Sequence, residues 1–233
     1  MENDPTYLQR LKDLPDELRR AYFEGDWDIF EGQAFDEWRR EKHVIAEFGY
    51  PLDYCLKVIG FDWGYNAPGA AVWLAYTPDR RVYQYRELYQ NKKTPLEWAR
   101  QIRTFCRLEK TEYIVLPHDC FENMAGHGSI AEVFTKELDG VCRVVGGKTM
   151  QKNARTQRKA IFHQYLADAP DGKPYLQVHE RCLNTIRTIP ELVYAGTDKE
   201  VKAEDIDTSG EDHLYDAVSM VLRLRLQDAK GAG

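Results

Sequence analysis

The order of β-rich and helical segments is the feature that most constrains the fold of this chain. Three runs rich in β-branched and aromatic residues follow one another, at residues 54–61, 70–76 and 81–89. After them, short apolar runs alternate with segments of helical periodicity as far as residue 227. Consecutive strands can pair as hairpins, whereas strands joined through helices pair in parallel. The order therefore predicts an α/β domain with a mixed sheet flanked by helices on both faces.

Local signals set the bounds of the later segments. Thr94 is a typical N-cap and Pro95 suits the first helical position, so a helix is expected from there to about Glu109. A short apolar strand at residues 113–116 stops at Pro117. The other expected helices span residues 129–138, 154–167, 182–189 and 211–227, and the other expected strands span residues 141–145 and 175–178.

The acidic charge of the chain is concentrated near its beginning. The formal net charge is -6, and residues 1–50 contain 13 acidic and 7 basic residues, so the remainder is neutral. Apolar residues at helical spacing, a turn-like break at residues 24–28 and the punctuation of Pro51 indicate a linker-like, helical and exposed acidic segment over residues 1–50. The main domain is then expected over residues 51–233.

One stretch of this neutral domain contains no acidic residue. Residues 141–167 have no Asp or Glu but six Lys and Arg residues. Such a run is often only a solvated helix face, yet the complete lack of acids favours contacts with the phosphates of nucleic acid. We therefore predict a DNA-binding basic stripe, formed by Lys148, Lys152, Arg155, Arg158 and Lys159.

Three other classes of protein are excluded by motif and composition. No apolar run is long enough to cross a membrane, and five cysteines without a C-x-x-C pair argue for a reducing cytoplasm rather than a disulfide framework. The sequence Gly146-Gly147-Lys148-Thr149 resembles the end of a phosphate-binding loop, but Cys142 occupies the position of the first glycine. A nucleotide-binding site is therefore not expected there.

Three aspartates occur where two strand ends and a helix can bring them together. Asp62 ends the first strand, Asp119 follows the strand at residues 113–116, and Asp216 lies near the apolar side of the last helix. Strand ends in such sheets are where sites form, and crowded carboxylates need cations to offset their repulsion. Because oxygen ligands suit Mg²⁺, these aspartates are predicted to bind two divalent cations for phosphodiester hydrolysis. Asp62 and Asp119 also have a plainer interpretation, as turn residues.

The start of the last helix contains two further candidates. Asp212 is interpreted first as a helix cap, because Ser209 precedes it by three residues, close to a capping-box pattern. His213 lies three residues before Asp216, on neighbouring helix surface, and can bind a metal or position a water. We therefore include His213 among the candidate catalytic residues.

These motifs resemble those of a known nuclease family. Residues 58–64 (VIGFDWG), 116–119 (LPHD) and 213–217 (HLYDA) look like the three acidic motifs of the large terminase nuclease of tailed bacteriophages. Residues 14–35, which include EGDW at 24–27, look like the segment that links the ATPase and nuclease domains of that family. The resemblance implies an RNase H-like fold in which Asp62, Asp119 and Asp216 hold two Mg²⁺ or Mn²⁺ ions beside His213.

The resemblance also implies a function. A protein of this family is a metal-dependent endonuclease that cuts concatemeric viral DNA during genome packaging, in the host cytoplasm. Its expected partners are double-stranded DNA and, in the full-length protein, an N-terminal packaging ATPase domain, the small terminase subunit and the portal. The sequence shows no such ATPase, so we expect an excised nuclease domain or one with a trimmed linker. Two alternatives remain open: a related RNase H-like nuclease such as a Holliday-junction resolvase, and a non-catalytic docking module of the packaging motor.

A polar excursion at residues 194–210 precedes the last helix. Its first part is typical of two short extended pieces around a turn, which predicts a β-hairpin. It is either a surface insertion without a role or a mobile flap over the metal site, with Lys199 and Lys202 available to DNA phosphates.

Overall fold

The structure is a computed structural model that describes residues 33–123, 128–147, 154–195, 206–207 and 209–231, with only the backbone of residues 226–231. Within these residues, seven strands form one sheet in the order β1-β7-β4-β3-β2-β5-β6. The strands are β1 (Val44–Ile45), β2 (Leu56–Asp62), β3 (Gly69–Tyr76), β4 (Val82–Gln90), β5 (Tyr113–Leu116), β6 (Arg143–Gly146) and β7 (Leu176–His179).

The sheet is mixed, as the order of segments predicts. Strands β2, β3 and β4 pair antiparallel, while β5 and β6 extend the β2 side, and β7 and β1 extend the β4 side, in parallel. Strands β2, β3 and β4 are consecutive and can turn back on one another, whereas β5, β6 and β7 each follow a helix, and β1 precedes them all in the chain. The predicted fold class is therefore confirmed.

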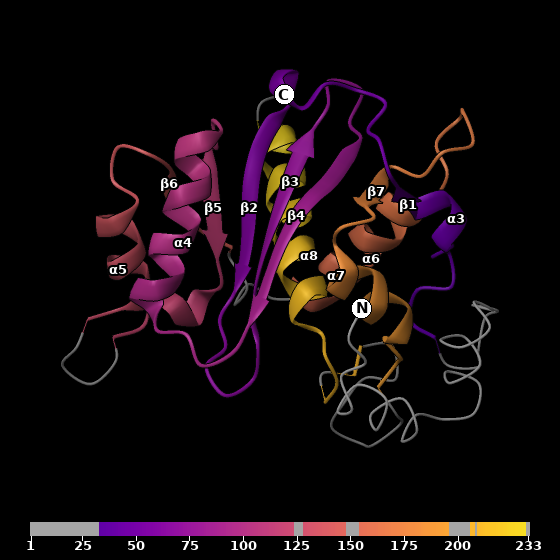
Figure 1. Ribbon diagram of the computed structural model, residues 1–233. Helices are drawn as coiled ribbons and strands as arrows, with labels where there is room; N and C mark the ends of the chain where they lie inside the picture. The colour runs from indigo at the N-terminus through magenta and orange to yellow at the C-terminus, as the bar shows by residue number, and fades with distance from the viewer. Residues whose placement is uncertain (1–32, 124–127, 148–153, 196–205, 208, 232–233) are drawn as a thin grey trace, which may run out of the picture.

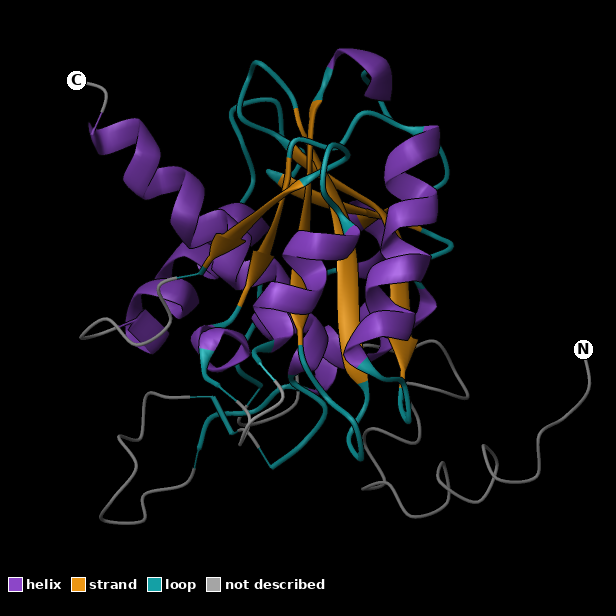
Figure 2. Ribbon diagram, turned by 90° about the vertical axis from the view of Figure 1, so that its left-hand side faces the viewer, coloured by secondary structure: helices purple, strands orange, loops and turns teal. Residues whose placement is uncertain are grey.

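Helices cover both faces of the sheet (Figure 1). One face carries α4 (Pro95–Leu108) and α5 (Ile130–Glu137), which lie in front of the strands in Figure 2. The other face carries α6 (Ala154–Leu166), α7 (Leu183–Thr188) and α8 (His213–Gly231). Strand β2 contributes alternate side chains to the two layers, with Val58 packing towards α8 and Ile59 and Phe61 towards α4 and α5. No helix in the described ranges is long and apolar enough to cross a membrane.

The predicted start of α4 is confirmed in detail. The Thr94 side chain accepts a hydrogen bond from the backbone N–H of Glu97, whose own carboxylate accepts from the Thr94 N–H at 2.8 Å. This reciprocal capping box and Pro95 at the first helical position satisfy backbone donors that the helix leaves unpaired. Ser129 and Glu132 form a second such box at the start of α5.

The described part of the acidic N-terminal segment differs from expectation. Only α3 (Arg40–His43) is helical within residues 33–50, and Phe35 and Trp38 are buried in the core rather than exposed. Phe35 contacts the rings of Phe162 and Tyr215, and β1 adds a parallel edge strand beside β7. The expected exposure is thus wrong for this part of the segment, because large aromatic side chains gain free energy by burial. Residues 1–32, which include the expected helix at residues 7–20, lie outside the described residues. The domain boundary at residue 50 stays a prediction.

Candidate active site

Parallel pairing brings the first two predicted aspartates to one edge of the sheet, the edge formed by the carboxyl ends of β2 and β5. Asp62 is the last residue of β2, and Gly60 lies opposite Val115 of β5. Asp119 follows β5 in a short 3-10 helix, η2 (His118–Phe121), where its Oδ1 accepts a hydrogen bond from the Cys120 N–H at 3.0 Å. Since β2 and β5 run in the same direction, both carboxylates belong to the same end of the sheet.

Helix α8 brings the third motif to the end of β2. It packs directly on that strand: a Cβ at Gly60 would lie 3.0 Å from Val221 Cγ2, and closer than that to the Ala217 carbonyl. Glycine in a strand interior commonly marks such a close approach of another backbone. The approach places His213 against Asp62, with 2.8 Å between His213 Nδ1 and Asp62 Oδ2. The helix thus begins at the site.

The electrostatics of this edge indicate a crowded group of carboxylates. Burial raises the pKa of Asp62, and the charges of Asp216 and Asp119 raise it further, while the hydrogen bond with His213 opposes this rise. The same hydrogen bond raises the pKa of His213. His213 and Asp62 are thus in direct contact, while Asp216 and, more weakly, the exposed Asp119 act on Asp62 through their charges, although these residues come from separate segments of the chain.

Asp212, interpreted from the sequence first as a helix cap and second as a ligand, also lies near these charges. It is buried, and burial together with the charge of Asp216 raises its pKa to about 6. Helix α8 begins at His213, so Asp212 itself occupies the N-cap position, where its carbonyl accepts the Asp216 N–H at 2.9 Å. The interpretation of Asp212 as a cap therefore agrees with the helix start, whereas Ser209 lies upstream of the cap. The position of Asp212 directly before the third acidic motif, one turn from Asp216, was the available signal for its place in the site.

Arg158 lies beside the cluster rather than on an open surface. It is buried on α6, and its Nη1 is 2.9 Å from Asp216 Oδ1. We therefore remove it from the predicted basic stripe, because a buried guanidinium that pairs with a carboxylate is not available to a DNA phosphate. Arg158 lies on the buried side of α6 together with Ala154, Phe162 and Leu166, at spacings of four residues, whereas Arg155 is exposed.

Other predicted DNA contacts are only partly described. Arg155 is exposed, and the Lys159 ammonium lies 5.0 Å from the centre of the Tyr194 ring. Lys148 and Lys152 lie outside the described residues, as do Lys199 and Lys202. Tyr194 forms an antiparallel bridge with Ile206, and residues 196–205, which include the expected hairpin turn, lie outside the described residues.

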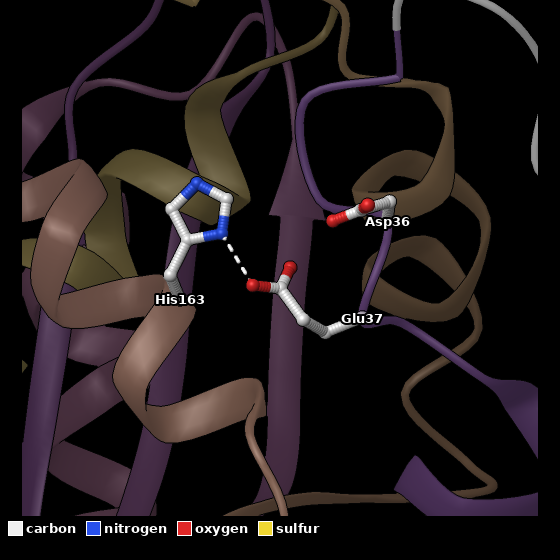
Figure 3. Close-up of side chains that lie close together, drawn as sticks. All are labelled: Asp36, Glu37 and His163. Atoms are coloured by element: carbon white, nitrogen blue, oxygen red, sulfur yellow. Dashed lines mark hydrogen bonds and ion pairs between the residues drawn. The ribbon is translucent and has the colours of Figure 1, made fainter.

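Asp36, Glu37 and His163 form a second group of potential metal ligands (Figure 3). Asp36, Glu37 and His163 have ligand atoms within 4.8 Å of one another, and 2.7 Å separates His163 Nδ1 from Glu37 Oε1. In the described part of the chain, no other three side chains of this kind have ligand atoms that close together. The ligand atoms of Asp62, Asp119 and Asp216 therefore lie farther apart. The contact fastens residues 36 and 37 to α6, and no sequence motif predicted it.

Comparisons with solved structures identify the fold. The large terminase of a thermophilic bacteriophage matches with a TM-score of 0.64 and 15% identity, over 95% of this chain and 51% of that protein. The P22 large terminase nuclease domain matches with a TM-score of 0.61 and 16% identity, over 84% of this chain and 93% of that domain. The nuclease domain of the large terminase g2p from bacteriophage SPP1, solved with bound Mn, matches with a TM-score of 0.54 and 17% identity, over 79% and 97%.

The chain thus spans about half the length of the thermophilic phage terminase and most of the separate nuclease domains. No protein-family model matches the sequence, and no curated protein matches it either. At identities below one fifth, the likeness establishes the architecture: this chain has the RNase H-like fold of large terminase nuclease domains. The resemblance inferred from the three acidic motifs is confirmed at this level.

Proposed function

We propose that this chain is a metal-dependent DNA endonuclease that cuts concatemeric viral DNA during genome packaging in the host cytoplasm. The observation that carries the proposal is the cluster formed by Asp62, Asp119, Asp216 and His213 at one edge of the sheet. The shared fold with large terminase nucleases supports it. In the full-length protein, an N-terminal packaging ATPase domain, the small terminase subunit and the portal would be the partners.

The donor set of the cluster fits hard divalent cations. Asp62, Asp119 and Asp216 offer carboxylate oxygens, which suit Mg²⁺ and Mn²⁺. Burial, together with the neighbouring carboxylates, raises the pKa values of Asp62 and Asp212, and a bound cation would favour their ionised forms. When bound, two such ions supply charge neutralisation at the scissile phosphate and a readily ionised water. The three aspartates would hold these ions, and buried Asp212 is a further available carboxylate.

The remaining tasks fall to residues of the chain itself. The hydrogen bond between His213 Nδ1 and Asp62 raises the pKa of His213 and keeps the imidazole ring beside the carboxylates. In this position the ring can orient a water. Arg155 and Lys159 of α6, with Lys148 and Lys152, would contact the DNA backbone without reading its sequence. An idle docking module has no need to bury repelling carboxylates, so the cluster favours the catalytic alternative.

The test is cleavage of plasmid DNA by the parent and by Asp62→Asn. We expect the parent to cleave DNA with Mn²⁺ or Mg²⁺ and not in excess chelator. In the variant we expect the cleavage rate to fall on the order of a thousandfold, because it lacks one carboxylate ligand of the ions that would neutralise charge and activate water. The matched control is Asp139→Asn, the same chemical change at an exposed residue. Asp139 precedes the amino end of β6, at the end of the sheet away from the site. Robust cleavage in chelator, or equal rates for Asp62→Asn and Asp139→Asn, would refute the proposal.

A further inference from the structure

Arg158 and Asp216 form a buried ion pair between two helices. The side chain of Arg158 is 8% exposed and that of Asp216 is 27% exposed, with 2.9 Å between Nη1 and Oδ1. The pair joins the middle of α6 to the first turn of α8. An ion pair with this little access to solvent is screened weakly, so its charges act strongly on their neighbours.

The surroundings of Arg158 leave Asp216 as its main compensating charge. A second buried guanidinium, that of Arg223, lies nearby, and burial together with the charge of Arg158 lowers its pKa. Arg223 Nε donates to Gln157 Oε1 at 2.9 Å, while the buried Nε of Arg158 has no hydrogen-bond partner among the residues that the structure describes. A guanidinium is always ionised, so the Asp216 carboxylate is held in place by a permanent positive charge.

The Asp216 carboxylate interacts both with Arg158 and with the neighbouring aspartates. Oδ1 of Asp216 meets Arg158, whereas the charge of Asp216 also acts on Asp62 and Asp212. A cavity of about 20 Å³, which is room for about one water, lies beside the pair and is lined by Arg155, Arg158, Lys159, Ile206, Asp212, Tyr215 and Asp216. Arg158 therefore fixes the orientation of Asp216 and adds positive charge next to the place where a cation would bind.

We propose that Arg158 is a positioning residue that fixes Asp216 for the reaction and at the same time weakens divalent-cation binding at this carboxylate. The inference rests on the proposed nuclease function and deepens it. Removing the guanidinium frees Oδ1 and removes a like charge, so cations bind more tightly. It also releases the carboxylate from its fixed orientation, so turnover falls. The two effects have opposite signs, which a merely structural arginine would not produce.

The experiment measures Mn²⁺ binding and turnover separately in the parent, Arg158→Gln and Arg158→Lys. Free Mn²⁺ is counted by electron paramagnetic resonance without DNA, and cleavage is measured at saturating Mn²⁺. For Arg158→Gln we expect the Kd for Mn²⁺ to fall roughly tenfold and kcat to fall roughly tenfold. Arg158→Lys keeps the charge and a single contact, so both quantities should return towards the parental values.

Arg107→Gln is the matched control for cation binding, because it removes the same charge from an exposed position on α4, on the opposite face of the sheet. Its Kd for Mn²⁺ should stay within about twofold of the parental value, since exposed charges are well screened. Weaker or unchanged Mn²⁺ binding in Arg158→Gln, or unchanged kcat, overturns the inference while leaving the proposed nuclease intact. If Asp216→Asn and the parent bind Mn²⁺ equally, both the proposed function and the inference fail.

Discussion

Replacing Gly60 by alanine tests the contact on which the site depends. Gly60 lies in the middle of β2, on the face covered by α8. An added Cβ would be 2.8 Å from the carbonyl carbon of Ala217, closer to its oxygen, and 3.0 Å from Val221 Cγ2. Carbon atoms in contact normally lie about 3.5–4.0 Å apart, and two of these three atoms belong to the helix backbone, which cannot rotate away as a side chain would.

The helix must therefore move outward by about 1 Å, measured against the ordinary contact distance. Overpacking of a filled core costs about 1–3 kcal/mol, and the backbone contact places Gly60→Ala near 3 kcal/mol. The same movement would stretch the bond of 2.8 Å between His213 and Asp62 and shift Asp216 with its helix. A displacement of this size at reacting groups lowers a rate by about a hundredfold.

Urea unfolding and single-turnover cleavage with Mn²⁺ measure the two effects. Gly49→Ala is the control, because its new Cβ would meet only Tyr83 Oη at an ordinary 3.7 Å. We expect its stability to stay within about 0.5 kcal/mol of the parent. If Gly60→Ala unfolds at the parental urea midpoint, the close packing of α8 on β2 is not what sets the site. If it is destabilised but cuts at the parental rate, the link from packing to catalysis is refuted.

Three further predictions concern charge. Folding raises the pKa of Asp212 from 3.8 to about 6, so the parent protein loses stability as the pH rises from 3.8 to 6. In metal-free buffer, Asp212→Asn should therefore be as stable as the parent below pH 3.8, and above pH 6 its free energy of unfolding should be higher by about 3 kcal/mol. Equal urea midpoints at pH 7 would contradict this. Glu87→Ala should lower the free energy of unfolding by about 2–3 kcal/mol, because the Glu87 carboxylate accepts four hydrogen bonds at the start of α7, two of them from backbone N–H groups. A thermal melt unchanged from the parent would disprove that role. Reversing the charges of Lys152, Arg155 and Lys159 together should weaken binding to any DNA sequence and flatten its salt dependence in fluorescence anisotropy; an unchanged slope would make them ordinary surface residues.

The sequence by itself determined the features that depend on neighbours along the chain. Strand β5 has the predicted bounds, α4 starts at the predicted cap, and Asp62 and Asp119 follow the predicted strand ends. These features are local: side-chain alternation, a capping side chain three residues from its partner, and proline punctuation act within a few residues. Parallel pairing of β2 and β5 then follows from the order of strands and helices, so the common edge of the two aspartates was predictable.

Only the tertiary structure decided which other side chains join that edge. Arg158 belongs to a basic run in the sequence, yet the rotation of α6 against α8 turns it inward to Asp216. Asp212 has the local features of a cap, but the approach of α8 to Gly60 buries it among carboxylates from other segments. Phe35 sits in an acidic stretch and is buried against Phe162 and Tyr215. These contacts join residues far apart along the chain, and their energies depend on how two elements pack rather than on the composition of either one.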